Sequence, residues 1–169
     1  MLDFAYYNQM ELNLCIEKVV NNKDLYFYFM FPYKFFSINI ENSERNSIQF
    51  VSKNSEGNII GYLAAYINHF DNSIENLDII NFTGKTNITF SKDVKLFFDY
   101  IFNNKGFRKI IFHVISKNPS VNLYRKLIKR LGGREVGILK RNKKLTNNEY
   151  YDEIIFEIFI DEYFKNVQI

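Results

Sequence analysis

The chain has 169 residues, of which 47% are hydrophobic and 18% aromatic, and its formal net charge is +3. This composition excludes intrinsic disorder and predicts one folded domain, residues 1–169, with a large core. The charge suits an anionic co-substrate but lacks the basic excess of nucleic-acid binders, so we expect no nucleic-acid partner.

The sequence gives no sign of a membrane or metal protein. No window approaches the roughly 20 apolar residues that span a bilayer, and the N-terminus does not resemble a signal peptide. We therefore expect a cytoplasmic protein with no membrane partner. Cys15 shares a helical face with Leu12, Ile16 and Val19, so we expect a buried thiol rather than a nucleophile. No spacing of His, Cys and Asp indicates a metal site.

The first half of the chain predicts helices followed by a hairpin and a third strand. In order, we expect a short strand at 1–7, a helix at 9–20, a short helix at 25–31 capped by Asp24, strands at 48–53 and 59–67, a polar turn at 69–76 and a strand at 77–82. Residues 33–46 follow no clear pattern. The hairpin is antiparallel because its two strands are joined by a short polar turn.

The second half alternates helices and strands. Ser91 is expected to cap a helix that ends near Gly106, and the apolar run 109–115 is typical of a strand buried on both faces. Asn118 and Pro119 favour a helix start, and Gly132-Gly133 favours its end. Strands at 134–140 and 151–160 follow, joined by a basic turn through Arg141, Lys143 and Lys144.

Residues 105–137 resemble the C-terminal half of the GNAT family of N-acetyltransferases. The matching features are Lys-Ile-x-x-x-Val at 109–114, Asn118, Tyr124, Gly132-Gly133 and Glu-Val-Gly at 135–137, and Tyr-Tyr-Asp at 150–152 extends the resemblance. It implies an α+β fold with a mixed, mostly antiparallel central sheet flanked by helices. It also implies acetyl-coenzyme A as the co-substrate and a primary amine as the acceptor.

The resemblance assigns roles to several residues. Asn118 would contact the pantetheine arm, and Tyr124 would act as the general acid that protonates the leaving thiolate. Backbone amides near Asn81 and Phe82 would hold the thioester carbonyl. The pyrophosphate would lie at the helix start that follows the third strand. The family's glycine signature is absent from that segment, and its candidates are Thr83, Gly84, Lys85, Asn87, Thr89 and Ser91.

Other assignments stay open at the level of sequence. Glu75 and Asp78 flank the third strand and are the candidate general bases, whereas His113 is expected to be a hydrogen-bonded core residue. A shifted alignment would place Asn122 and Lys129 in the slots given to Asn118 and Tyr124.

Three functions remain in competition. The first is an N-acetyltransferase whose acceptor is an amino acid, a polyamine, an aminoglycoside or a protein N-terminus. The second is a catalytically degenerate interaction module of the same fold, which binds coenzyme A weakly or not at all. The third, a single-stranded nucleic-acid binder, is disfavoured by the modest charge. A homodimer formed through the final strands is possible in the first two cases.

Overall fold

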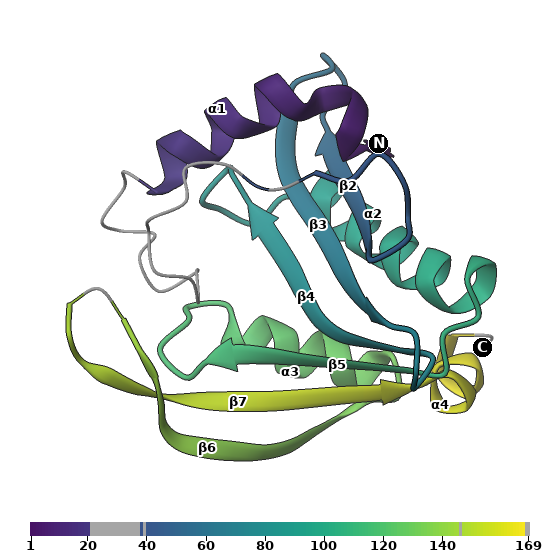
Figure 1. Ribbon diagram of the computed structural model, residues 1–169, viewed down its shortest axis with the longest axis vertical. Helices are drawn as coiled ribbons and strands as arrows, with labels where there is room; N and C mark the ends of the chain where they lie inside the picture. The colour runs from purple at the N-terminus through teal and green to yellow at the C-terminus, as the bar shows by residue number, and fades with distance from the viewer. Residues whose placement is uncertain (21–37, 39, 146, 168–169) are drawn as a thin grey trace.

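The computed structural model describes residues 1–20, 38, 40–145 and 147–167. A seven-stranded sheet runs through it in the order β1-β2-β3-β4-β5-β7-β6 (Figure 1). The strands are β1 Leu2–Phe4, β2 Ser47–Lys53, β3 Ile59–Asn68, β4 Ser73–Asn81, β5 Lys109–Ile115, β6 Arg134–Lys144 and β7 Tyr150–Phe159. The helices are α1 Gln9–Val20, α2 Ile88–Asp99, α3 Val121–Arg130 and α4 Ile160–Val167, with a 3-10 turn η1 Ala5–Asn8 and a π-helical turn η3 Tyr100–Asn104. No helix among these is long and apolar enough to cross a membrane.

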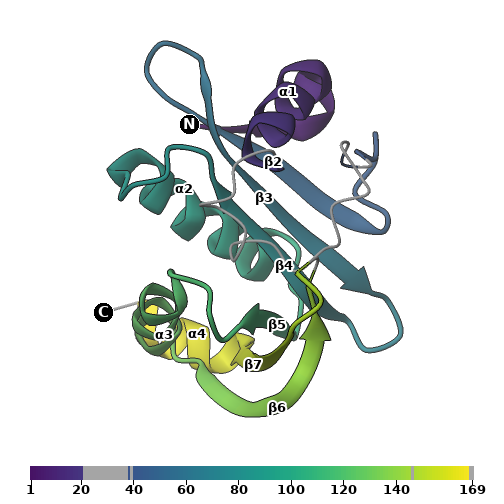
Figure 2. The ribbon, with the colours of Figure 1, turned by 90° about the vertical axis from the view of Figure 1, so that its left-hand side faces the viewer.

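Helices cover the two faces of the sheet unequally (Figure 2). One face, called here the α1 face, carries a small core in which Leu12 and Ile16 of α1 pack on Tyr62 and Ala64 of β3. The opposite face, called the α2 face, carries the larger core beneath α2, α3 and α4. Its largest buried side chains are Phe97, Phe98, Phe102, Phe112, Phe156 and Tyr163. This arrangement confirms the expected α+β fold with a mixed, mostly antiparallel sheet.

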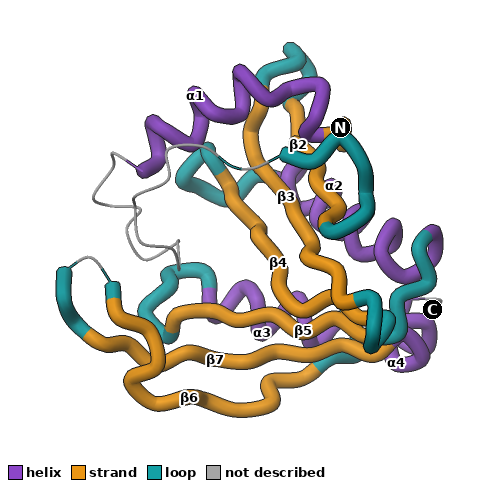
Figure 3. The backbone as a smooth tube through the Cα atoms, in the orientation of Figure 1, coloured by secondary structure: helices purple, strands orange, loops and turns teal. Residues whose placement is uncertain are grey.

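The sheet opens between β4 and β5. Every other strand pair is antiparallel, but β4 and β5 are parallel and share only two ladder pairs, Ser73–Lys109 and Ile74–Ile110. Beyond Ile74 the two strands separate (Figure 3), and we call this separation the β4–β5 gap. A bulge in β4 lies at the same point, because Glu75 has no partner on β3 between the Ile67–Ile74 and Tyr66–Asn76 pairs. Such bulges bend a strand and increase its twist.

The predicted elements are largely confirmed, with differences at their ends. The helix at 9–20 and the strand at 109–115 match the structure residue for residue. The strand predicted from residue 77 begins at Ser73 instead, because Ser73, Ile74 and Asn76 still pair with β3. The expected turn at 141–144 is wrong, since Lys143 and Lys144 are still paired with β7. The helix α4 was not expected. The predicted helix at 25–31 and its cap Asp24 lie outside the described residues.

The predicted caps of α2 and α3 are corrected. Asn87, not Ser91, caps α2 by accepting from the Phe90 N–H at 3.0 Å, and Ser91 instead lies within the first turn. The residue before α3 is Ser120 rather than Asn118, and the Asn118 side chain accepts from the Ser120 N–H at 2.8 Å in the preceding turn. The strand β5 is also buried mainly on one face, because Ile111 and His113 are only half-buried.

The predicted glycine stop of α3 is confirmed. Gly132 has φ +83°, and its N–H donates to the Lys129 carbonyl at 3.3 Å while the Gly133 N–H donates to the Ile128 carbonyl at 2.8 Å. These are the two bonds of a Schellman motif, which satisfies the last carbonyls of a helix. The chain therefore reverses directly into β6, and α3 stays packed on the α2 face.

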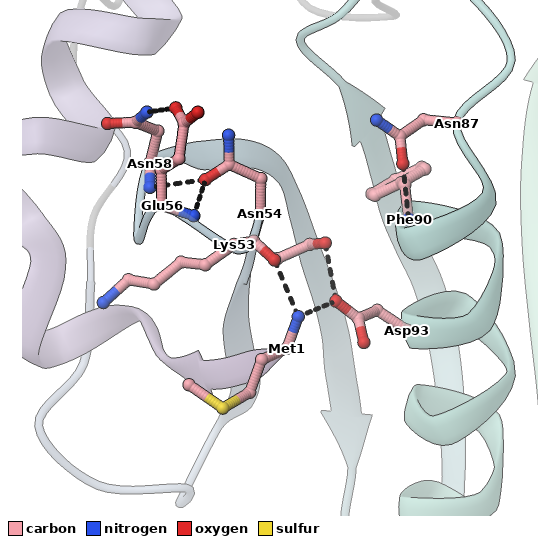
Figure 4. A network of polar contacts seen from close by, with 9 residues as sticks. Met1, Lys53, Asn54, Glu56, Asn58, Asn87, Phe90 and Asp93 are labelled. Atoms are coloured by element: carbon pink, nitrogen blue, oxygen red, sulfur yellow. Dashed lines mark hydrogen bonds and ion pairs between the residues drawn. The ribbon is translucent and has the colours of Figure 1, made fainter.

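The first strand is tied to α2 by a buried carboxylate (Figure 4). Asp93 is 3% exposed, and its Oδ2 accepts from the Ser52 hydroxyl at 2.7 Å and from the Met1 α-amino group at 2.9 Å. The same amino group donates to the Lys53 carbonyl at 2.7 Å. A buried carboxylate is tolerated only when it is paired and hydrogen-bonded, and here both conditions are met.

Gly61 predicts how sensitive the start of α2 is to a single methyl group. A Cβ at this position of β3 would lie 2.2 Å from the Phe90 ring and 2.8 Å from the Ile80 carbonyl. Gly61→Ala should therefore lower the free energy of unfolding by about 1–3 kcal/mol, measured by urea denaturation. Gly137→Ala is the matched control, because nothing lies within 4 Å of its Cβ position. Equal losses in the two variants would contradict the close packing of Phe90 on Gly61.

Candidate active site

The backbone of β4 offers hydrogen-bonding groups to the β4–β5 gap. The Phe82 N–H donates to the Ile60 carbonyl of β3 at 3.0 Å. Because peptide groups alternate in direction along an antiparallel strand, those of Ile79 and Asn81 turn away from β3 and toward β5. The ladder to β5 has ended before this level. The predicted role of the Asn81 amide stays open, but the Phe82 amide is a wrong assignment because β3 already occupies it.

Tyr124 reaches the same part of β4 from α3. Its hydroxyl donates to the Ile79 carbonyl at 3.3 Å, and its ring meets Phe112 edge-on, with centroids 6.0 Å apart. The half-buried ring packs against the main core, as expected of a residue on the helical stripe with Val121 and Ile128. The two sequence interpretations of Tyr124 are therefore compatible, since the ring belongs to the core and the hydroxyl lies at the gap.

Asn118 lies in the turn that joins β5 to α3. It is 8% exposed, its N–H donates to the Ile115 carbonyl at 2.9 Å, and its Oδ1 accepts from Ser120. Its Nδ2 makes no hydrogen bond to the described residues. The side chain thus fixes the exit of β5 and keeps a donor available, as a pantetheine contact would require.

The segment between β4 and α2 is ordered by side chains rather than by glycines. Asn81 Oδ1 accepts from the N–H and the hydroxyl of Thr83 at 2.9 and 2.7 Å, and Asn81 Nδ2 donates to the Lys85 carbonyl at 2.8 Å. Gly84 has φ +66°, which lets the chain turn between them. The sequence placed Thr83, Gly84 and Lys85 in one candidate segment, and in the structure the Asn81 side chain bonds to Thr83 and Lys85 of that segment.

The start of α2 has the properties of an anion site. Asn87 caps Phe90, while the N–H groups of Ile88 and Thr89 have no partner among the described residues. Free amides in the first turn combine with the helix dipole to favour a phosphate. The side chains of Lys85 and Thr89 are exposed beside this turn. Ser91 is less suited to bind a ligand, because its hydroxyl donates to the Asn87 carbonyl at 2.9 Å.

The two candidate bases differ in their surroundings. Glu75 is exposed at the bulge and bonds to Asn68 near the β3–β4 turn. Asp78 lies beside Tyr66, whose hydroxyl donates to its Oδ2 at 2.7 Å. Burial raises the pKa of the Asp78 carboxyl, and the hydrogen bond from Tyr66 acts in the opposite direction. Burial, with the nearby Asp78 charge, also raises the pKa of Tyr66, so this phenol stays protonated as a donor. Of the two candidates, Asp78 is therefore the carboxylate held in a defined position by a partner in the sheet, whereas Glu75 is exposed.

A second hydrogen-bonded pair supports this part of the sheet. Gln49 of β2 donates from Nε2 to the Tyr62 hydroxyl at 2.9 Å, and its Oε1 accepts from the Glu41 N–H at 2.9 Å. These residues were not identified from the sequence, because their partners lie on different strands.

The described residues contain no group of three or more His, Cys, Asp and Glu that could hold a metal ion.

Comparison with known proteins finds similarity in structure alone. No family model matches the sequence, and no curated protein matches it. Among solved structures, a spermidine N-acetyltransferase from Vibrio cholerae in complex with CoA and spermine aligns with a TM-score of 0.74 at 23% identity, covering 96% of each chain. A single-residue mutant of the spermidine N-acetyltransferase SpeG from Vibrio cholerae aligns with a TM-score of 0.72 at 22% identity, also covering 96% of each chain.

A third match has higher identity over a shorter stretch. Mutant forms of the spermidine/spermine N-acetyltransferase SpeG from Vibrio cholerae align at 26% identity over 73% of each chain, with a TM-score of 0.62. These similarities establish that the chain has the fold of the GNAT acyltransferases.

The environment of Asp78 predicts a stability that depends on pH. Because the pKa of Asp78 is raised in the folded state, the folded protein binds this proton more tightly, and stability falls as pH rises from the ordinary carboxyl pKa toward the folded value. Asp78→Asn should therefore raise the free energy of unfolding at neutral pH, and the gain should vanish in acid. Urea denaturation across this pH range measures it. A variant that is less stable at neutral pH would contradict the burial of a costly charge.

Proposed function

We propose that this chain is an acetyl-coenzyme A-dependent N-acetyltransferase that acts on a primary amine. The observation that carries the proposal is the Tyr124 hydroxyl, held 3.3 Å from the Ile79 carbonyl where β4 and β5 have separated. An acid at this position meets backbone groups of Ile79 and Asn81 that face the gap. The fold shared with spermidine N-acetyltransferases supports this assignment.

The residues present fit the parts of acetyl-coenzyme A. The peptide groups of β4 that face the gap can bind an extended, amide-containing arm as a neighbouring strand would. The first-turn amides of Ile88 and Thr89 suit the pyrophosphate, and Lys85 adds a positive charge beside them. Asn118 supplies an amide donor on the other side of the gap.

Four roles in the reaction can be assigned to side and main chains. The Asn81 amide donates to the thioester carbonyl and stabilises the negative charge that develops there. Asp78 attracts the acceptor as an ammonium ion. After the neutral amine attacks, Tyr124 donates its proton to the leaving sulfur. Tyr66 keeps the Asp78 carboxylate in place through its hydrogen bond at 2.7 Å.

A polyamine such as spermidine is the proposed acceptor class. The enzymes that this chain is similar to in structure are named for spermidine, and one of them holds spermine. The ammonium groups of a polyamine would find a carboxylate in Asp78, which the Tyr66 hydroxyl holds by a hydrogen bond. We further propose a cytoplasmic enzyme in which residues 1–169 act as one domain, without nucleic-acid or membrane partners, and in which a homodimer can form.

Acetyl-coenzyme A should stabilise the folded chain. At about 100 times its dissociation constant, a ligand raises the free energy of unfolding by about 2.7 kcal/mol, which shifts the melting temperature by several degrees. Thermal unfolding with and without acetyl-coenzyme A measures this, with adenosine monophosphate as the control ligand. No shift at any soluble concentration would favour the non-catalytic interaction module.

Tyr124→Phe should separate chemistry from binding. Loss of the acid should lower kcat for spermidine acetylation by about 100-fold or more, followed through the free thiol released. The ring contact with Phe112 is retained, so the affinity for acetyl-coenzyme A and the melting temperature should hardly change. Tyr100→Phe is a matched control, because its hydroxyl contacts Glu44 instead. An unchanged kcat in Tyr124→Phe would exclude the acid role.

A further inference from the structure

His113 does not lie in the core, where the sequence led us to expect it. Its neighbours on β5, Ile110, Phe112 and Val114, belong to the core of the α2 face. Because side chains alternate along a strand, His113 points to the α1 face. Its side chain is 29% exposed, and its Nδ1 lies 3.3 Å from Glu153 Oε1 on β7. Its Nε2 makes no hydrogen bond to the described residues.

Glu153 is a buried carboxylate in contact with His113. Its residue is 1% exposed, Asn142 donates to its Oε2, and Lys143 Nζ lies 3.2 Å from its Oε1. Among the described residues Oε1 has no fully formed hydrogen bond, although it contacts both His113 and Lys143. A carboxylate that faces Nδ1 selects the tautomer with the proton on Nδ1 and leaves Nε2 as the basic nitrogen.

The same alternation places Asp78 on the α1 face. Leu77 belongs to the core of the α2 face, so Asp78, the next residue, points to the opposite side, where Tyr66 contacts it. Asp78 is the fourth residue after Ile74, and His113 is the third after its ladder partner Ile110. The bulged residue in β4 accounts for this difference. Asp78 and His113 thus face the same side of the sheet, on the two strands that border the gap.

We propose that His113 is the general base of the acetyl transfer, that Glu153 is its positioning residue, and that Asp78 holds the acceptor as an ammonium ion. This proposal rests on the proposed function. The proposal gives the binding of the ammonium ion to Asp78 and the removal of its proton to His113. One carboxylate performs both tasks poorly, because an ionised carboxylate that attracts the ammonium ion is a weak base. A neutral imidazole can take a proton near neutral pH, where a carboxylate stays ionised.

The proton balance of the step is complete. The ammonium ion gives one proton to His113 Nε2, and the neutral nitrogen then forms the C–N bond to the thioester carbonyl carbon. The C–S bond breaks, and the sulfur takes the proton of Tyr124. The second proton of the nitrogen returns to Tyr124 as the amide forms, and His113 releases its proton to water. The products are an N-acetyl amine, free coenzyme A and one proton.

The charges that face His113 come from several strands. Glu153 of β7 and Lys143 of β6 are its near neighbours, and Asp78 of β4 lies across the gap. On its own strand Lys109 is already paired with Glu157, at 2.8 Å. Glu153, at 3.3 Å, is therefore the carboxylate in contact with the His113 ring.

The test compares pH profiles of kcat/KM for spermidine, measured for wild type, His113→Gln, Glu153→Gln and His69→Gln. His69, the other histidine of the chain, lies at the β3–β4 turn near the Arg45 carbonyl and is the matched control. We expect the wild-type profile to have an acid limb between about pH 5 and 8. His113→Gln should lose this limb and about 100-fold in kcat/KM, and His69→Gln should keep both.

Two further results would separate a base from a structural residue. Glu153→Gln should lower kcat/KM and leave the affinity for acetyl-coenzyme A unchanged, because the imidazole loses the carboxylate beside its Nδ1. Added imidazole should restore part of the activity of His113→Ala. An acid limb that persists in His113→Gln overturns this proposal and leaves the acetyltransferase intact. A wild type that binds no acetyl-coenzyme A and acetylates no amine overturns both.

Discussion

The parallel junction of β4 and β5 holds the two halves of the sheet together with only two ladder pairs. Main-chain groups beyond such a junction lack the partners that a continuous sheet would give them, and unpaired backbone groups are costly when they are buried. The α2 face spans this opening. Helices α2, α3 and α4 pack one continuous core across both halves, and that core includes residues of β3, β4, β5 and β7.

The opening also orders the proposed chemistry. In that proposal, substrate groups meet peptide groups on the β4 side, Tyr124 of α3 from the α2 face, and polar side chains of β4 and β5 on the α1 face. The leaving sulfur and the incoming amine would thus be served by different layers of the protein. The hydroxyl of Tyr124 joins α3 to the main chain of β4 through the Ile79 carbonyl, and a substrate can replace this contact.

Local signals in the sequence were enough to predict those elements whose conformation depends only on their own residues. The stripe of α1, the apolar run of β5 and the glycine pair after α3 each specify their own conformation. The start of α2 is different, because Asn87 and Ser91 are both good cap residues, and local pattern does not distinguish them. In the structure the cap is Asn87, and the Phe90 that it caps packs closely on Gly61 of β3. Helix α4 escaped notice for a similar reason, since Tyr163 is held by Phe102 and Asp99 far away in the chain.

The candidate site was accessible to the sequence only in part. Tyr124 and Asn118 were found by resemblance, because neither position has a pattern that distinguishes a site from a core residue. The bulge at Glu75 depends on pairing with β3, and no composition rule reveals it. The roles of Ile79 and of Tyr66 arise from a main-chain direction and a cross-strand contact, and the pairing of His113 with Glu153 joins residues forty positions apart.

The glycine pair after α3 affects how the activities of substituted variants should be interpreted. A Cβ at Gly132 would lie 2.5 Å from the Glu162 carbonyl of α4, and one at Gly133 would lie 2.5 Å from the Glu157 carbonyl of β7. A side chain at either position must push α3 away from its neighbours, and α3 carries Tyr124. A scan scored by activity alone would therefore mark the C-terminal helix and this turn as a second functional region. The loss of activity would in fact report the displacement of Tyr124 by substitutions that lie away from the reacting groups.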